Sequence, residues 1–160
     1  MISDNNILKT HEKFMSEAIN EALSAYEEGE VPIGAVAVKN GALIGKEHNR
    51  VEQLKDCTAH AEMLLLRKLF KKTGDWRLEG ISLYVTLEPC AMCAGAVQLA
   101  RIDSLIFGTD NKKKGAVNSL FKVLDDARLN HRVKIIKGVK ETENRNLLKK
   151  FFKERRNENY

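Results

Sequence analysis

Long apolar runs are absent from this sequence: no stretch approaches the roughly 20 apolar residues that are needed to span a bilayer. The residues from Met1 to Thr10 are polar and mixed, without the charged and then apolar pattern of a secretory signal. Cysteine is scarce too, with three among 160 residues. We therefore expect a cytoplasmic protein without a membrane partner, whose thiols bind metal or stay free.

Internal repeats and low-complexity tracts are also missing. A chain of 160 residues with 43% apolar content has enough material for one core, so we expect a single domain over 1–160. Lys and Arg outnumber Asp and Glu by 27 to 22, and the resulting net charge of +5 permits a polyanionic partner without requiring one.

Helical and strand-like stretches alternate along the chain, which predicts an α/β fold. Asn40 and Gly41, between the first two expected strands, are typical of a type I′ hairpin turn. More than a dozen residues separate the last two expected strands, which is long enough for a crossover connection, so we expect these two to be parallel. Helices are expected at about 10–28, 58–70, 90–100, 119–127 and 141–156, and strands at 31–38, 42–46, 81–87, 102–107 and 133–136.

Two short segments thirty positions apart contain the donors of a metal site. His60 belongs to the first, and Cys90 and Cys93 to the second. One imidazole and two thiolates are donors that zinc prefers, and three protein ligands leave a fourth position for water. Glu62, two residues after His60, could act as general acid and base for that water. Thr58 is the expected N-cap of a helix whose first turn would then hold both His60 and Glu62.

A closed structural site is the alternative, because Cys57 lies three residues before His60 and could supply a fourth ligand. A structural site has no use for the carboxylate of Glu62. Pro89 directly before Cys90 presets the first turn of a helix, whose N-terminal end would stabilise thiolates there. Both features favour the open, catalytic site.

The basic C-terminal stretch at about 141–156 is predicted to be a helix with Lys149, Lys153 and Arg156 on one face. Such a charge run is more often a solvated helix face than a binding site. Composition alone therefore assigns it no role.

Longer stretches carry a resemblance that covers nearly the whole chain. The sequence resembles the bacterial tRNA-specific adenosine deaminases of the cytidine deaminase superfamily, in which H-x-E is followed by P-C-x-x-C. The metal motif by itself would indicate only the superfamily, whereas the longer stretches and the basic helix indicate the tRNA branch. The matching stretches are 31–35, 48–49, 58–62, 84–96, 107–108, 130–132 and 151–152.

The resemblance implies that His60, Cys90 and Cys93 bind one zinc ion (Zn²⁺) per subunit. Glu62 would take a proton from water and pass one to the leaving amine, while adenosine becomes inosine. Asn49 would bond the flipped base. The further substrate contacts that it implies are Ala61, Pro89, Asn111, Phe152 and Arg155.

The resemblance further implies a three-layer α/β/α sandwich around a five-stranded mixed sheet. The substrate would be the wobble adenosine in the anticodon stem-loop of an arginine tRNA, bound by a homodimer. Two positions depart from the family pattern: Cys57 stands where relatives often have proline, and Asn111 where they usually have aspartate. We expect Cys57 to be a free thiol. The rival interpretations are a deaminase of a free base and a catalytically silent RNA-binding subunit.

Overall fold

The computed structural model describes residues 4–158, and in it five strands form one mixed sheet in the order β2-β1-β3-β4-β5. β1 is antiparallel to both of its neighbours, β2 and β3, whereas β3, β4 and β5 are parallel. The expected five-stranded mixed sheet with its last two strands parallel is confirmed. The strands are β1 (Gly34–Lys39), β2 (Ala42–His48), β3 (Ile81–Leu87), β4 (Ser104–Thr109) and β5 (Lys134–Lys137).

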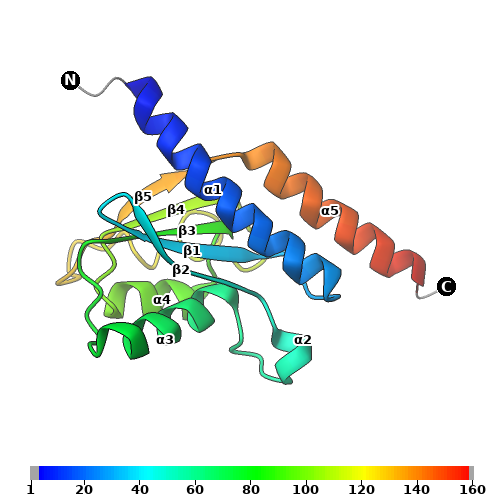
Figure 1. The fold of residues 1–160 in the computed structure, drawn as a ribbon, viewed down its shortest axis with the longest axis horizontal. Coiled ribbons are helices and arrows are strands. Elements are labelled where there is room, and N and C mark those ends of the chain that lie inside the picture. The colour runs from blue at the N-terminus through cyan, green and yellow to red at the C-terminus, as the bar shows by residue number, and fades with distance from the viewer. Residues whose placement is uncertain (1–3, 159–160) are drawn as a thin grey trace.

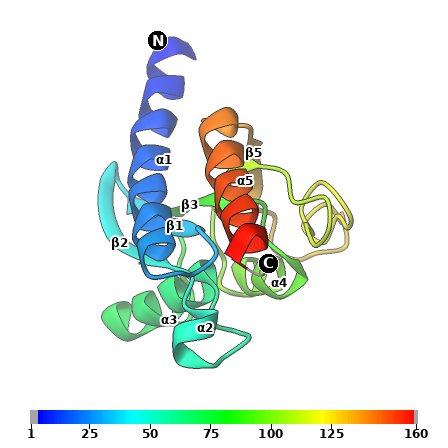
Figure 2. The same cartoon turned by 90° about the vertical axis from the view of Figure 1, so that its right-hand side faces the viewer.

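Helices cover both faces of the sheet, which makes the three expected layers (Figures 1 and 2). α1 (Asp4–Glu27) and α5 (Glu141–Glu158) lie side by side on one face. α3 (Ala61–Thr73) and α4 (Ala91–Leu99) lie on the other. A short helix, α2 (Val51–Leu54), follows β2 beyond the edge of the sheet.

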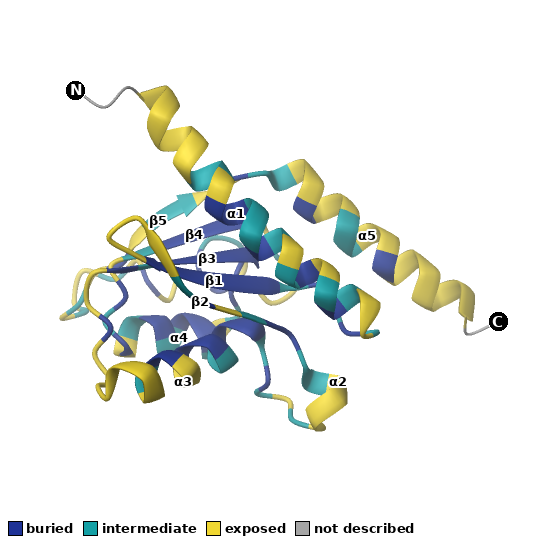
Figure 3. Ribbon diagram, viewed as in Figure 1, coloured by how far each residue is buried: buried dark blue, intermediate teal, exposed yellow. Residues whose placement is uncertain are grey.

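Both faces of the central strands are buried, as Figure 3 shows, because successive side chains of a strand point to opposite faces. Even-numbered residues of β1, β3 and β4 pack under α1, and odd-numbered ones pack under α3 and α4. On the α1 side the strand residues are Val36, Val38, Tyr84 and Ile106. On the other side they are Ala35, Ala37, Ile81, Leu83, Val85, Leu105 and Phe107.

The hairpin between β1 and β2 has the predicted turn. Asn40 has φ 51° and Gly41 has φ 74°, and the flanking Lys39 and Ala42 are paired. Positive φ at both central residues is the requirement of a type I′ turn, so this prediction is confirmed.

The helix expected at 119–127 is wrong: this stretch forms turns. The backbone N–H groups of Val117, Asn118 and Ser119 donate to the carboxylate of Glu88, at 3.1, 2.6 and 2.8 Å. The N–H groups that follow, of Leu120, Phe121 and Val123, bond to the carbonyls of Gly115 and Ala116, five to seven residues earlier, so the hydrogen bonds between residues four apart that define an α-helix do not form.

Several expected boundaries also shift. α1 begins at Asp4 and not near 10, and β2 continues to His48. β1 begins at Gly34 and not at 31, because Pro32 has no N–H and Ile33 donates its own to Val31 in a tight turn. The short helix α2 was not expected.

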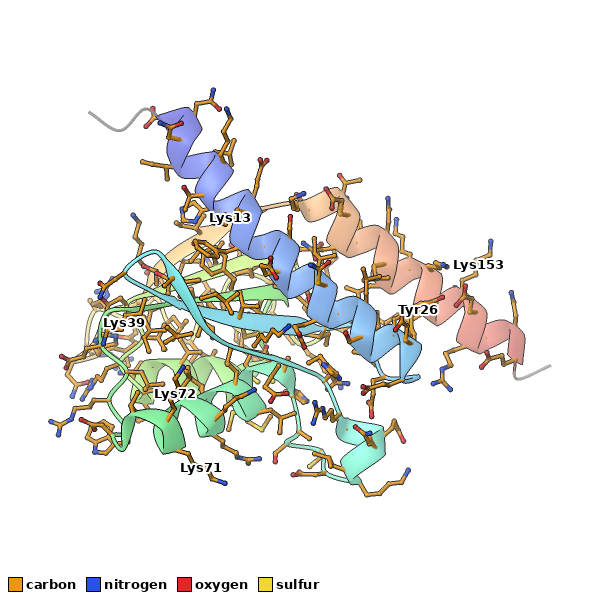
Figure 4. The ribbon with its side chains drawn as sticks, in the orientation of Figure 1. Lys13, Tyr26, Lys39, Lys71, Lys72 and Lys153 are labelled. Atoms are coloured by element: carbon orange, nitrogen blue, oxygen red, sulfur yellow. The ribbon has the colours of Figure 1, made fainter. Side chains whose placement is uncertain are left out.

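The C-terminal half of α5 is attached to the end of α1 through Tyr26, which lies between the two helices in Figure 4. The Tyr26 ring contacts that of Phe151 edge-on at 5.9 Å, and its hydroxyl donates to Glu154. Arg155 donates to the carbonyl of Gly29, just after α1. The expected basic helix is confirmed. None of the helices in 4–158 is long and apolar enough to cross a membrane.

Gly34 sets how closely α1 approaches the sheet. A Cβ at this position would overlap the carbonyl oxygen of Ala18 and lie 2.6 Å from the backbone nitrogen of Ala22. We therefore expect Gly34→Ala to lower the free energy of unfolding by about 3 kcal/mol, measured by urea denaturation. Gly95→Ala is the control, because a Cβ there meets nothing within 4 Å. Equal stability of the two variants would contradict this packing.

Candidate metal centre

Three potential metal donors come together where α3 and α4 begin. His60 Nδ1 lies 3.6 Å from Cys90 Sγ and 3.5 Å from Cys93 Sγ. All three donor atoms lie within 4.8 Å of one another. The predicted ligands are thus brought into one cluster that could hold a metal ion.

His60 is the N-cap of α3, with extended backbone (φ −72°, ψ 151°), and not a residue of the first turn. Thr58 is not the cap, because Asp56 Oδ1 accepts both its N–H, at 2.8 Å, and its hydroxyl, at 2.7 Å. The predicted cap is wrong, but the change explains the site. Side chains two apart on a regular helix diverge, whereas the extended backbone at His60 allows its ring to join the sulfurs beside Glu62.

Cys90 is likewise an N-cap with extended backbone (φ −73°, ψ 175°), and α4 begins one residue later than expected. Pro89 is therefore outside the first turn. It is buried, and its carbonyl accepts the N–H of Ala116 at 2.9 Å, while Cys90 pairs with Gly115. Cys93 stays in the first turn of α4, at the positive end of the helix dipole.

Glu62 is 4% exposed, next to the donor cluster in the first turn of α3. Burial raises the pKa of this carboxyl group to about 7. Its predicted neighbour Ala61 is the buried first residue of the helix. A buried carboxyl group beside three metal donors can hold a proton out of contact with bulk water.

The three donors shift one another's pKa values. The hydrogen bond from Cys93, followed by that of His60, lowers the pKa of Cys90 to about 3 against the effect of burial. The same contact, with burial, raises the pKa of Cys93. The hydrogen bond to Cys90 raises the pKa of His60 against the effect of burial. A divalent cation would compete with these protons for both sulfurs and the imidazole.

Asn49 lies on the segment that follows β2, and it is 4% exposed. Its Nδ2 donates to Glu30 Oε2 at 3.3 Å. The next residue, Arg50, donates its N–H to the carbonyl of Ala59 at 3.0 Å. Because Ala59 precedes His60, this bond ties the Asn49 segment to the metal cluster.

Asn111 lies on the turn segment that follows β4, which a second buried carboxylate holds in place. Glu88 is 1% exposed and accepts the N–H of Asn111 at 2.9 Å, in addition to the bonds from 117–119 and the hydroxyl of Ser119. Burial by itself would raise the pKa of Glu88, but the bonds from Ser119, Asn111 and Asn118 lower it. Pro89 and the metal donor Cys90 follow Glu88 directly in the chain. The bond from Asn111 to Glu88 therefore holds Asn111 near the cluster of metal donors.

Phe152 and Arg155 are not part of the cluster. They line a groove of about 600 Å³ between α5, the end of α1 and α2, together with Glu30, Glu52 and Gln53. Phe152 is 47% exposed there. Glu30 is the residue that connects this groove to Asn49.

Glu30 and Glu88 are the site residues that sequence reasoning missed. Glu88 follows the strand expected at 81–87, and Glu30 precedes the one expected at 31–38, and no periodicity or spacing marks either residue. Their only sequence signal is the position of a charged residue next to a strand that is expected to be buried.

Known proteins match this chain over most of its length, in sequence and in fold. The model of the MafB19-like deaminase family matches residues 9–156. A tRNA-specific adenosine deaminase of Aquifex aeolicus is 51% identical over 146 residues, 91% of this chain and 96% of that protein. The one of Bacillus subtilis is 49% identical over 145 residues, 91% and 90% of the two chains. A structure from a study of A-to-I editing by tRNA:A34 deaminases has a TM-score of 0.81 and 43% identity over 85% of this chain and 99% of the other.

Whether Cys57 binds the metal decides between an open site with three protein ligands and a closed site with four. This thiol is free and exposed, and the cluster of donors in 4–158 does not include it. We therefore expect Cys57→Ser to keep one metal ion per subunit, measured by elemental analysis after chelator treatment and reloading. Cys90→Ser, the matched control, should lose most of its metal. If both variants lost their metal, Cys57 would be a ligand, and the interpretation as a four-ligand structural site would be correct.

Proposed function

Because this chain belongs to the family of tRNA-specific adenosine deaminases, we propose that it hydrolyses adenosine to inosine at the wobble position of a tRNA anticodon and releases ammonia. Residues 1–160 act as one deaminase domain. The observation that carries the proposal is the cluster of His60 Nδ1 and the sulfurs of Cys90 and Cys93 beside buried Glu62.

The metal of this proposal is zinc, one ion per subunit. Zinc binds sulfur at about 2.3 Å and imidazole nitrogen at about 2.0–2.1 Å, so the S···N edge of its tetrahedron is about 3.6 Å. The distances of 3.6 and 3.5 Å from His60 Nδ1 to the sulfurs of Cys90 and Cys93 support this assignment. When bound, zinc supplies a Lewis acid that activates water at its fourth position.

Glu62 carries protons between water and the leaving group. Its carboxylate accepts a proton as water adds to carbon 6 of the adenine. It then donates a proton to the exocyclic amine, which leaves as ammonia. The site's exclusion of solvent, with Glu62 4% exposed, keeps this proton from exchanging with bulk water between the two steps.

The substrate is the anticodon stem-loop, of an arginine tRNA by family resemblance. A base in a loop is already unstacked, so it enters a pocket at lower cost than a base in a duplex. Asn49, Ala61, Pro89 and Asn111 contact the target nucleotide. Phe152 and Arg155, in the groove beside α2, contact the RNA further from it.

The exposed face of α5 adds sequence-independent affinity for phosphate. Lys149, Lys153 and Arg156 are all exposed there, and Lys153 is labelled in Figure 4. Cationic side chains on a helix bind the RNA backbone and release counterions. An enzyme that acts on tRNA works where tRNA is used in translation, so we place it in the cytoplasm.

The enzyme acts as a homodimer, and the outer surface of α4 supports this part of the proposal. α4 has no charged residue, and Leu99 at its end is 69% exposed. A surface helix without charge is suited to pack against a second copy.

Glu62 provides the test of the reaction. We expect purified, zinc-loaded protein to form inosine in an anticodon stem-loop with adenosine at the wobble position. Glu62→Ala should lower kcat by about 10²–10⁴-fold, because the proton carrier is lost while the metal ligands remain. Inosine formation is measured by mass spectrometry of digested RNA, and metal content is measured on the same samples.

Free adenosine, guanine and cytosine are the competing substrates in this experiment. If the protein converted a free base and not the stem-loop, its function would be deamination of nucleobases. A zinc-loaded wild type that binds the stem-loop without converting it would favour the silent RNA-binding subunit.

Leu99 provides the test of the dimer. We expect the wild type to have twice the subunit mass in light scattering, and Leu99→Glu to be monomeric, because a carboxylate would be buried without a partner at the interface. Leu23→Glu is the matched control, since Leu23 is also on a helix surface, at 42% exposure on α1. A monomeric wild type, or dissociation of both variants, would contradict this interface.

A further inference from the structure

Glu30 is a buried carboxylate that the proposed reaction does not use. It is 1% exposed and follows Gly29, where the chain leaves α1 with φ 76°. Its backbone N–H donates to the carbonyl of Ala25 at 2.9 Å, so the residue is anchored to the end of that helix. A buried carboxylate is costly unless hydrogen bonds compensate it.

Glu30 accepts three hydrogen bonds from one short segment. Oε2 accepts from Asn49 Nδ2 at 3.3 Å and from the N–H of Glu52 at 3.2 Å. Oε1 accepts from the N–H of Gln53 at 2.6 Å. Glu52 and Gln53 are the second and third residues of α2, so this carboxylate fixes the first turn of α2 and the side chain of Asn49 together.

The chemistry of this contact determines how the Asn49 amide is turned. The NH₂ group of Asn49 is the donor and an oxygen of Glu30 is the acceptor, so the NH₂ end of the amide faces Glu30. The described residues give no hydrogen bond to Asn49 Oδ1. The carbonyl and the second N–H of Asn49 therefore keep one fixed arrangement for a bound base.

The same carboxylate lies where two parts of the candidate site meet. Glu30, Glu52 and Gln53 line the groove that holds Phe152 and Arg155. On its other side, the Asn49 segment is joined to Ala59, next to a metal donor, by the bond from Arg50. A change at Glu30 would thus reach the base contact without touching the metal donors.

We propose that Glu30 is a positioning residue: its buried carboxylate orients the Asn49 amide and holds segment 49–53, so that the flipped base meets one arrangement of donor and acceptor. The proposal rests on the proposed deamination. Glu30 itself touches neither the base nor the metal, and it acts through Asn49.

A double-mutant cycle in the zinc-loaded enzyme tests this, with the anticodon stem-loop as substrate. Gln at position 30 can donate as well as accept, so Glu30→Gln frees the Asn49 amide to turn over. We expect kcat to fall about 10- to 100-fold, with a smaller change in KM because RNA backbone contacts persist. In an Asn49→Ala background, Glu30→Gln should cause little further loss. Glu27→Gln, an exposed site three residues earlier, is the charge-matched control and should leave both constants unchanged.

The cycle separates positioning from mere structural support. If Glu30→Gln costs the same factor with Asn49 present or absent, Glu30 does not act through Asn49 and the proposal is overturned. Loss of bound metal in Glu30→Gln would also overturn it, because the effect would then arise at the donor cluster. An inactive wild type would overturn the proposed function instead, and the contact is then decided by the following measurement.

The side-chain NH₂ of Asn49 reports on the contact without any turnover. Its NMR signals are assigned by their loss in Asn49→Ala. We expect slow hydrogen exchange in the wild type and about tenfold faster exchange in Glu30→Gln. Wild-type exchange as fast as that of an exposed amide would overturn the proposal, even if Glu30→Gln proves too unstable to study.

Discussion

The meeting of two helix N-termini at one edge of the sheet is the constraint on which the site depends. α4 begins directly beyond the carboxyl end of β3, and α3 must begin at that same edge for His60 Nδ1 to lie 3.6 and 3.5 Å from the two sulfurs. The N-cap residues His60 and Cys90 both have extended backbone, so these two donors project from the helix ends, and Cys93 joins them from the first turn of α4. A helix N-terminus also stabilises thiolate, which suits the metal chemistry.

Two buried carboxylates place the loops around this centre. Glu88 holds the segment after β4, which carries Asn111, and Glu30 holds the segment after β2, which carries Asn49. Each carboxylate accepts several backbone N–H groups, and such charge-assisted bonds are stronger than those between neutral groups. These bonds hold the two irregular segments in one conformation, as backbone hydrogen bonds do in helices and strands.

The exposed position of Cys57 favours an open metal site with three protein ligands over a closed site with four. Cys57 is close to His60 in sequence, but the turn at 56–58 leaves its thiol exposed and outside the cluster. The fourth position of the cluster is thereby left without a ligand from the part of the chain that the structure describes. An open position is what a hydrolytic reaction requires and what a structural zinc site lacks.

Much of the fold could be predicted because hydrophobic periodicity records which faces are buried. The hairpin at Asn40 and Gly41 was correct because local backbone geometry alone determines that turn. The helix expected at 119–127 was wrong because the N–H groups of Leu120 and Val123 bond to the carbonyls of Gly115 and Ala116 and not to carbonyls four residues earlier. The cap expected at Thr58 was wrong because Asp56 competes for the same hydroxyl.

The sequence by itself predicted the three donors that the structure brings together, and a proton carrier for them, because zinc chemistry depends on residue types and short spacings. It also predicted the order of the five strands. Only the tertiary structure decided that His60 and Cys90 are caps, that Cys57 stays outside, and that Glu30 and Glu88 hold the loops. The bonds of Glu30 and Glu88 join residues far apart in the chain, and no periodicity or local propensity records them.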